Sequence, residues 1–552
     1  MQVAFRPKLA TVIREGYSAS TFRADAVAGL TVAIVALPLA MALGIASGTS
    51  PDKGLVTAVI AGFLISALGG SRVQVGGPTG AFVVVIFNVI AKHGYDGLLI
   101  ATLLAGLILI LAGVFRLGQM IKYIPHPVVT GFTAGIAVII ASSQVKDFLG
   151  LSIDKVPADF IPKWQAYLAT ISTISWATLG VGAGALAIVI GSRKLAPKLP
   201  AFLIAVVVSS IAVAVLKLPV DTIGSRFPDI PAGLPMPSLP EISLAKVNAV
   251  LPSAFTIAFL AGIEALLSAV VADGMAGTRH RSNQELIGQG IANLGSALFG
   301  GLPATGAIAR TATNIRSGAK TPVAGIMHAV LLLFFILFAT DLMAYVPMAA
   351  LAAILFMVAW GMSEYEQFLA LLRMPNGDRA VLLLTFGLTV LVDLTVAIGV
   401  GVTLASLLFM ARMAEAVEVD AGVTRDPELD IEDIHQRDAL PAGVEVFRIN
   451  GPFFFGVAGE LLDTLRRVGE PPQVIILRMR LVPLLDSSGV QALEKFIEQA
   501  RIAGTRVILS GVRPQPFVML KRARLGRASG KLLYASNYTK ARSLALGLLE
   551  EP

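Results

Sequence analysis

Long apolar stretches separated by short polar loops run from about residue 26 to about residue 411. A helix that crosses a bilayer needs about 20 apolar residues, and fewer where it is broken and lined by protein. The third and tenth stretches are too short to cross alone, and glycine- and proline-rich residues precede each of them. The pattern predicts an all-α polytopic membrane domain of about fourteen spans, at residues 26–47, 53–70, 78–92, 97–115, 124–143, 170–191, 199–216, 252–275, 285–300, 305–318, 322–340, 345–362, 379–394 and 395–411.

Beyond the last span the chain has the texture of a soluble protein. Residues 444–449 alternate like a strand, 474–477 and 507–510 are apolar like buried strands, and 459–468 and 488–503 have a helical period. Alternating strands and helices indicate a small α/β domain. The predicted organisation is a cytoplasmic N-terminal segment (1–24), a transmembrane domain (25–413), a polar linker (414–442) and an α/β domain (443–552).

Composition supports the membrane class and excludes several others. Of 552 residues, 55% are hydrophobic and only 14% are charged, whereas a soluble protein has roughly a quarter of its residues charged. The net charge of +8 does not indicate a nucleic-acid partner, because the basic residues fall in short loops between spans. Cysteine is absent and the five histidines are scattered. With no nucleophile–base set or metal cluster in the sequence, we expect neither an enzyme nor a cofactor.

The basic loops also predict an orientation. Short cytoplasmic loops of membrane proteins are enriched in lysine and arginine. With the N-terminus inside, the inside loops carry most of these residues, and the short outside turns hold few. The N-terminus lacks the features of a secretory signal. We therefore expect a multi-pass protein of a bacterial inner membrane with both termini cytoplasmic. The basic residues of the inside loops are Arg72, Arg116, Lys122, Arg193, Lys194, Lys198, Arg279, Arg281, Arg316, Lys320, Arg373, Arg379 and Arg412.

Two related motifs open the truncated spans. One is Gly76-Gly77-Pro78-Thr79-Gly80-Ala81-Phe82, and the other is Gly300-Gly301-Leu302-Pro303-Ala304-Thr305-Gly306-Ala307. They occupy the third and tenth spans, which are matching places in two halves of seven spans each. Because seven is an odd number, the second half starts on the opposite side of the membrane and runs in the opposite direction. Short, interrupted segments at matching places of inverted repeats indicate a binding site at the membrane midplane.

A helix that begins inside a membrane exposes its first four N–H groups and about half a positive charge. Two such ends that face each other form a receptor for an anion, with Thr79 and Thr305 as suitable N-caps. The alternative interpretation is that these are helix-packing glycines. The predicted substrate-binding residues are Thr79, Gly80, Ala81, Phe82, Thr305, Gly306, Ala307, Ile308, Ala309 and Arg310.

Ionisable residues inside the spans are few, and each costs about 3 kcal/mol at the membrane centre. Arg310 lies one turn beyond the second motif, and Glu264 lies near the middle of the eighth span with Ser268 one turn further on. We expect Arg310 to stabilise the anion and Glu264, with Ser268, to couple its movement to H⁺ or Na⁺. A structural ion pair between Glu264 and Arg310 is the alternative. A dianion would bind with Glu264 protonated, or with a sodium ion beside it.

These residues resemble the sulfate permease (SulP) family of anion transporters, and the C-terminal domain resembles a STAS domain. The resemblance implies two inverted seven-span repeats, divided into a core and a gate that work as an elevator, in a homodimer. It also implies a site between the starts of the third and tenth helices. Leu39 and Leu43 stand where the family often has glutamine and an aromatic residue. The supporting segments are Gly29–Thr31, Ala36–Ala40, Gly77–Thr79, Glu285–Gly290, Ala309–Thr311, Gly318–Pro322 and Asp486–Gly489.

Within this family, residues 261–281 and 358–364 look closest to the bacterial C4-dicarboxylate branch. The resemblance thus implies symport of a succinate- or fumarate-like dicarboxylate with protons. Bicarbonate or sulfate uptake coupled to sodium or protons is the alternative. Two other classes stay open: an anion channel or voltage-sensitive motor, and a membrane scaffold that acts through the STAS domain.

The turn Asp486-Ser487-Ser488-Gly489 has two interpretations. In bacterial relatives of this domain such a serine can be phosphorylated, so Ser487 or Ser488 is a candidate regulatory site. The alternative is that both serines cap the helix that follows. The domain is expected to contact a second subunit or to dock a cytoplasmic protein.

Overall fold

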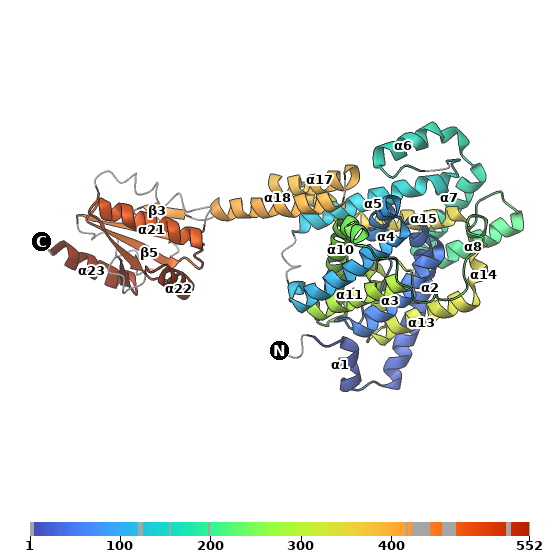
Figure 1. The fold of residues 1–552 in the computed structure, drawn as a ribbon, viewed down its shortest axis with the longest axis horizontal. Coiled ribbons are helices and arrows are strands. Elements are labelled where there is room, and N and C mark those ends of the chain that lie inside the picture. The colour runs from blue at the N-terminus through green and yellow to red at the C-terminus, as the bar shows by residue number, and fades with distance from the viewer. Residues whose placement is uncertain are drawn as a thin grey trace. The chain divides into compact units, whose positions relative to one another are not determined.

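A computed structural model of the chain describes residues 5–119, 125–153, 156–196, 199–392, 394–415, 418–421, 442–454, 471–525 and 532–550. It divides into two compact units, which we call the helical unit (Met1–Thr403) and the C-terminal unit (Leu404–Pro552). The ribbon of each unit can be followed in Figure 1.

The first half of the helical unit ends at α8, before a short turn of helix. After the amphipathic α1, it contains seven predicted spans, two of which lie in α4 because Gly94, at φ 71°, breaks that helix in the middle. The ten-residue α6 lies in a loop for which the sequence predicted no helix. The elements are α1 (Lys8–Glu15), α2 (Ala19–Ala46), α3 (Pro51–Leu68), β1 (Gly76–Gly77), α4 (Gly80–Val114), α5 (His126–Leu149), α6 (Phe160–Ala169), the 3₁₀ turn η2 (Ile171–Thr173), α7 (Trp176–Leu195), α8 (Ala201–Leu216) and α9 (Ile223–Arg226).

The second half repeats this order and begins at α10. Each of the remaining predicted spans falls on a described helix, and the predicted helical membrane domain is confirmed. Eight helices among the described residues are long and apolar enough to cross a membrane, and α8 and α13 are shorter apolar helices. The elements are α10 (Leu244–Ala276), α11 (Ser282–Leu298), β2 (Thr305–Gly306), α12 (Ile308–Arg316), α13 (Val323–Phe338), α14 (Thr340–Met343), α15 (Met348–Met362), α16 (Tyr365–Leu372), α17 (Asn376–Leu391) and α18 (Leu394–Glu415).

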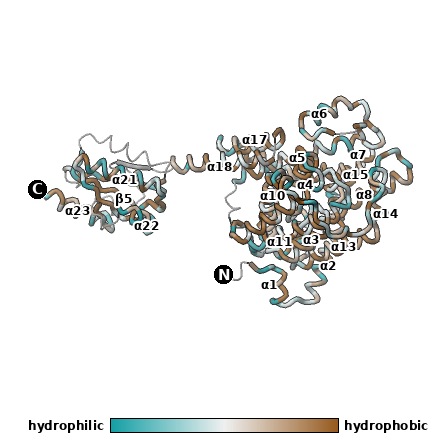
Figure 2. The backbone as a smooth tube through the Cα atoms, in the orientation of Figure 1, coloured by the Kyte–Doolittle hydropathy of each residue, from teal (hydrophilic) through white to brown (hydrophobic). Residues whose placement is uncertain are grey.

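The helical unit packs as two groups of helices, which we call the core and the gate. The core joins α2, α3 and α4 to α10, α11, α12 and α13, and the gate joins α5, α7 and α8 to α15 and α17. Hydrophobic stretches, brown in Figure 2, run through the helical unit. Within the core, α2 and α3 approach so closely that a Cβ atom at Gly54 would lie 1.9 Å from the carbonyl oxygen of Ala40. A residue without a side chain is therefore required at this crossing.

The C-terminal unit is a five-stranded sheet in the order β3-β4-β5-β6-β7, parallel except for β3. Side chains alternate across β5, so Ile475 and Leu477 pack under α21 while Val474 and Ile476 pack under α23. The predicted α/β domain is thereby confirmed. The elements are β3 (Glu418–Ala421), β4 (Val444–Asn450), β5 (Val474–Leu481), α21 (Ser487–Ile502), β6 (Arg506–Ser510), α22 (Pro514–Arg522), β7 (Leu533–Ala535) and α23 (Tyr538–Glu550).

Two expectations for this part of the chain need comment. The predicted linker 414–442 is not structureless throughout, because β3 lies inside it and pairs with β4. An edge strand of four residues gives little sequence signal, since its partner supplies the hydrogen bonds. The rest of the linker up to residue 441 and the predicted helix 459–468 lie outside the described residues.

Replacing Gly54 by alanine tests the close crossing of α2 and α3. Overpacking a tight interface typically costs about 1–3 kcal/mol, so we expect Gly54→Ala to lower the midpoint of thermal aggregation in detergent. Gly184→Ala in α7 is the matched control, because nothing lies within 4 Å of its Cβ position. An unchanged midpoint for Gly54→Ala would show that the two helices are not held this closely.

Candidate functional site

The two truncated spans meet where their motifs cross. β1 and β2 pair antiparallel, with Gly76 opposite Gly306 and Gly77 opposite Thr305. Helices α4 and α12 begin directly after these strands, at Gly80 and Ile308. The crossing thus brings the N-termini of two helices together in the middle of the core, each with a partial positive charge and free N–H groups.

The two threonines of the motifs do not cap their helices. Thr79 occupies the N-cap position of α4, but its hydroxyl donates to Oε2 of Glu264 at 2.9 Å. Thr305 lies in β2, two residues before the N-cap Ala307, and its hydroxyl donates to the carbonyl oxygen of Ala261 at 2.8 Å. The prediction of Thr305 as an N-cap is therefore wrong, and Thr79 lacks the capping hydrogen bond. Both side chains instead fasten the crossing to α10, because that helix offers acceptors beside them.

Arg310 is the buried cation of this region. Its side chain is 2% exposed, and Nη2 donates to the carbonyl oxygen of Pro78 at 3.2 Å. Nε and Nη1 have no hydrogen-bond partner among the described residues. A Cβ atom at Gly77 would lie 2.3 Å from Nη1. The guanidinium therefore lies against β1 with two donors available to a ligand.

Glu264 and Arg310 do not form the structural ion pair that was the alternative interpretation. Among the described residues, no Lys, Arg or His nitrogen lies within 4.0 Å of the Glu264 carboxylate. The hydroxyl of Thr79 is its hydrogen-bond donor. A buried cation and a nearby carboxylate that are not neutralised by each other can both act on a third, charged species.

Ser268 lies deeper than Glu264 and contacts the crossing indirectly. Its fully buried hydroxyl donates to Oγ1 of Thr311 at 3.3 Å, and Thr311 accepts from the backbone N–H of Val75 at 3.1 Å. This chain of hydrogen bonds joins α10, α12 and the residue before β1. Ser268 thus fixes the position of the crossing, and its predicted role in ion coupling stays a prediction.

Two residues that sequence reasoning missed complete this framework. Nε2 of Gln74 donates to the carbonyl oxygen of Ala265 at 3.1 Å, and Nδ2 of Asn314 donates to the carbonyl oxygen of Val73 at 2.8 Å. A Cβ atom at Gly306 would lie 1.4 Å from Nε2 of Gln74. The sequence signal that could have identified both residues is a polar side chain close to a glycine-rich break in an apolar chain.

The other predicted site residues differ in exposure. Ala81 and Phe82 are buried, as are Gly80 and Ala307, whereas Ile308 is 37% exposed and Ala309 is also exposed. The first turn of α4 is thus enclosed, and the first turn of α12 has one open face.

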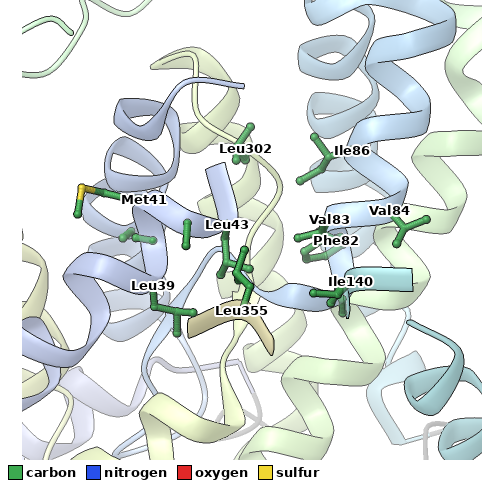
Figure 3. Close-up of a cluster of buried hydrophobic side chains, with 14 of the residues drawn as sticks. Leu39, Met41, Leu43, Phe82, Val83, Val84, Ile86, Ile140, Leu302 and Leu355 are labelled. Atoms are coloured by element: carbon green, nitrogen blue, oxygen red, sulfur yellow. The ribbon is translucent and has the colours of Figure 1, made fainter. Parts of the chain in front are cut away.

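Hydrophobic side chains enclose the first turn of α4. Figure 3 shows Leu43 of α2, Phe82 of α4, Ile140 of α5 and Leu355 of α15 in one buried cluster. Leu39 lies in the same cluster. The two leucines that replace the family's glutamine and aromatic residue therefore extend an apolar wall and supply no donor.

The core touches the gate at the start of α4. A Cβ atom at Gly80 would lie 2.7 Å from the sulfur of Met362 in α15 and 3.1 Å from Cδ1 of Ile140 in α5. Only nonpolar side chains of the gate make this contact. Such a contact has no hydrogen bonds to break when one group slides along the other.

The serine turn of the C-terminal unit is capped by a different residue than predicted. Oδ1 of Asp486 accepts from the backbone N–H of Gly489 at 2.7 Å, and Ser487 is the first residue of α21. The interpretation that Ser487 and Ser488 are the caps is therefore wrong, because the aspartate one residue earlier takes that place. Ser487 is exposed, and its phosphorylation stays a prediction.

Comparison with known proteins adds independent information. The sulfate permease family matches residues 22–385, and the STAS domain matches residues 439–536. A Bacillus subtilis (strain 168) protein named "Putative sulfate transporter YvdB" is 41% identical over 94% of this chain and 96% of its own length. The bicarbonate transporter BicA of Picosynechococcus sp. is 32% identical over 91% of each chain. The solved structure of SLC26A9 has the same fold, with a TM-score of 0.84 at 18% identity over 99% of this chain and 93% of that one.

Moving the guanidinium without removing its charge tests the site. In Gly77→Ala the new methyl group would displace Nη1 of Arg310, and we expect anion affinity to fall at least about tenfold, the value of a hydrogen bond to a charged group. Isothermal titration of the purified chain with bicarbonate and with sulfate measures this. Gly94→Ala is the control for backbone strain, because Gly94 also has a positive φ but no atom within 4 Å. Equal losses in the two variants would contradict a role for Arg310 in binding.

Proposed function

The chain belongs to the sulfate permease family of anion transporters, and from that premise we propose that it is a secondary active carrier for a small oxyanion, bicarbonate before sulfate. The observation that carries this proposal is the buried Arg310 guanidinium, with two unpaired nitrogens, beside two facing helix N-termini. Preorganised donors of this kind bind an anion without reorganising the protein.

The charge of the site favours a monoanion. The two helix ends contribute about +1 together, Arg310 adds one, and an ionised Glu264 removes one. The site then carries about +1, which one bicarbonate neutralises. Sulfate would require a protonated Glu264, or a sodium ion beside it, for the same balance.

The apolar wall argues against a dicarboxylate. A second carboxylate buried without a partner costs several kcal/mol, and Leu39, Leu43 and Phe82 belong to the apolar cluster that contains the first turn of α4. The two curated relatives described above are named for sulfate and bicarbonate. The C4-dicarboxylate branch that the sequence suggested has no support from them, so succinate and fumarate enter only as competitors in the test.

We infer an elevator movement in which the core carries the anion past the gate. The nonpolar contact of Gly80 with Met362 and Ile140 supports sliding at this interface. Glu264 is the proposed coupling residue, because its carboxylate accepts from Thr79 at the start of α4 and changes charge when it binds H⁺ or Na⁺. The binding of a coupling ion at Glu264 would therefore be linked to the binding of the anion through the Thr79 hydroxyl.

The proposal also covers the membrane location of the protein, its subunit contacts and its regulation. Loop charge favours both termini in the cytoplasm, and the bacterial relative supports a place in a bacterial inner membrane. We also propose a homodimer, with the C-terminal unit as the surface that contacts the second subunit or a cytoplasmic protein. Ser487, exposed at the start of α21, is the proposed regulatory position on that unit.

Uptake by proteoliposomes tests the substrate and the coupling together. We expect saturable uptake of labelled bicarbonate driven by a sodium or pH gradient, reduced by excess sulfate and not by succinate. Glu264→Gln should keep anion exchange and lose the dependence on the gradient, because the amide cannot change charge. Glu241→Gln is the control, since that carboxylate is 92% exposed in a loop. Gradient-driven uptake of succinate with no uptake of bicarbonate or sulfate would overturn the substrate assignment.

A further inference from the structure

A cavity separate from the Arg310 site lies between the core and the gate. Its volume is about 140 Å³, enough for about four waters at ~30 Å³ each. The cavity is lined by Val83 and Phe87 of α4, Ile45 of α2, Ser143 of α5 and Lys163 of α6. The loop charges predict this end of the helical unit to be extracellular.

The charged residues of this cavity are mostly positive. Arg226 pairs with Asp147, Nη1 to Oδ1, at 2.9 Å, and Nζ of Lys146 donates to the carbonyl oxygen of Ile153. Asp147 is the one acidic residue among those that line the cavity, against Lys146, Lys163 and Arg226. The residues of the lining therefore carry an excess of positive charge, and a second carboxylate, Asp221, pairs with Arg226 from outside the lining at 3.7 Å.

Lys163 is the unusual member of this set. It is 5% exposed, and within the part of the chain that the structure describes, its Nζ makes no ion pair and no hydrogen bond. Burial lowers the pKa of Lys163, opposed by the charge of the exposed Asp159 at the start of α6. Asp159 acts on the Lys163 ammonium without forming an ion pair with it, and an anion in the cavity would offset the remaining cost of this burial.

The cavity lies beside the path to the central site. Val83 and Val84 line it and follow directly on the predicted binding residues Gly80–Phe82. Ile139 also lines it, and its neighbour Ile140 approaches Gly80 from the gate. Leu43, Phe82 and Ile140 form an apolar cluster at the start of α4 (Figure 3).

We propose that this cavity is a second anion site, in which Lys163, supported by Lys146 and Arg226, holds a small inorganic monoanion outside the central site. Its place on the transport path rests on the proposed function, whereas the binding itself does not. The excess of positive charge raises the local concentration of anions at the mouth of a carrier. The helix α6 is not part of a predicted span, and in this proposal its role is to supply the ammonium group of Lys163.

Tryptophan fluorescence offers a direct test. Trp164 follows Lys163 in α6, and its Nε1 donates to Ser142, the neighbour of the lining residue Ser143. In the full chain carrying Trp176→Phe and Trp360→Phe, Trp164 is the one remaining tryptophan of three. Iodide is a small monoanion that quenches tryptophan and does not titrate. We expect quenching with a saturable component in this background.

Variants at Lys163 decide the origin of that component. Lys163→Met should raise the iodide concentration for half-saturation at least about tenfold, and Lys163→Arg should restore it. Lys92→Met, at an exposed lysine on the same predicted side, should leave it unchanged. Saturable quenching that survives Lys163→Met, or is lost in Lys92→Met, would overturn the proposal.

The pH dependence keeps the test informative if Lys163→Met does not fold. Because only the charged form binds the anion, affinity should fall as pH rises through the lowered pKa of Lys163, and Lys163→Arg should show no such fall. Lys146, Asp147 and Arg226 line the same cavity, Asp221 pairs with Arg226, and the charge of Asp159 acts on the ammonium. Tyr167 lies one turn further along α6, and burial raises its pKa above the usual value. An equal fall in wild type and Lys163→Arg would overturn the assignment.

The same background separates this proposal from the central site. Arg310→Met should abolish uptake and leave the saturable quenching of Trp164 unchanged. Loss of quenching in Arg310→Met would show that iodide reports the central site and that the outer site does not exist. Quenching that depends on Lys163 in a chain that transports neither bicarbonate nor sulfate would refute the proposed function alone.

Discussion

The structure depends on how a protein satisfies backbone N–H and C=O groups where a membrane helix is broken. Lipid offers no partner for them, so an interrupted span is stable only where other protein groups replace the lost hydrogen bonds. Here the two interrupted spans supply partners to each other through β1 and β2. The same pairing fixes where α4 and α12 begin, and hence where two positive helix ends face one site.

Side chains of α11 extend this solution to the neighbouring loops. Asn293 pairs with both the N–H and the carbonyl of Ala304, each at 2.9 Å, as a strand partner would. Oε2 of Glu285 accepts from the backbone N–H groups of Gly70 and Ser71 at 2.7 and 3.0 Å. The polar framework around the crossing therefore lies within the core, whereas at the start of α4 the gate contributes the nonpolar side chains of Met362 and Ile140.

The sequence predicted the fold well because spans and breaks have strong local signals. Long apolar runs, the repeated Thr-Gly-Ala and the isolated Arg310 were sufficient to find the crossing and its neighbours. The errors share one physical origin, which is the competition between local and distant acceptors. Thr305 and Ser487 each had the residue type of a cap, but Thr305 found the carbonyl of Ala261 and Asp486 was better placed than Ser487. Sequence spacing cannot reveal partners that only the packed structure provides.

The two halves of the site are similar but not equivalent. Helix α4 begins at the glycine of its Thr-Gly-Ala motif, whereas α12 begins one residue beyond the alanine of its own. One half contributes Thr79, bonded to Glu264, and the other contributes Arg310, bonded to Pro78 of the opposite half. A ligand at their junction therefore lies off any twofold axis and meets a cation on one side only. A planar or tetrahedral oxyanion would adopt one preferred orientation there, so the site distinguishes the two ends of its ligand although the fold that builds it is nearly symmetric.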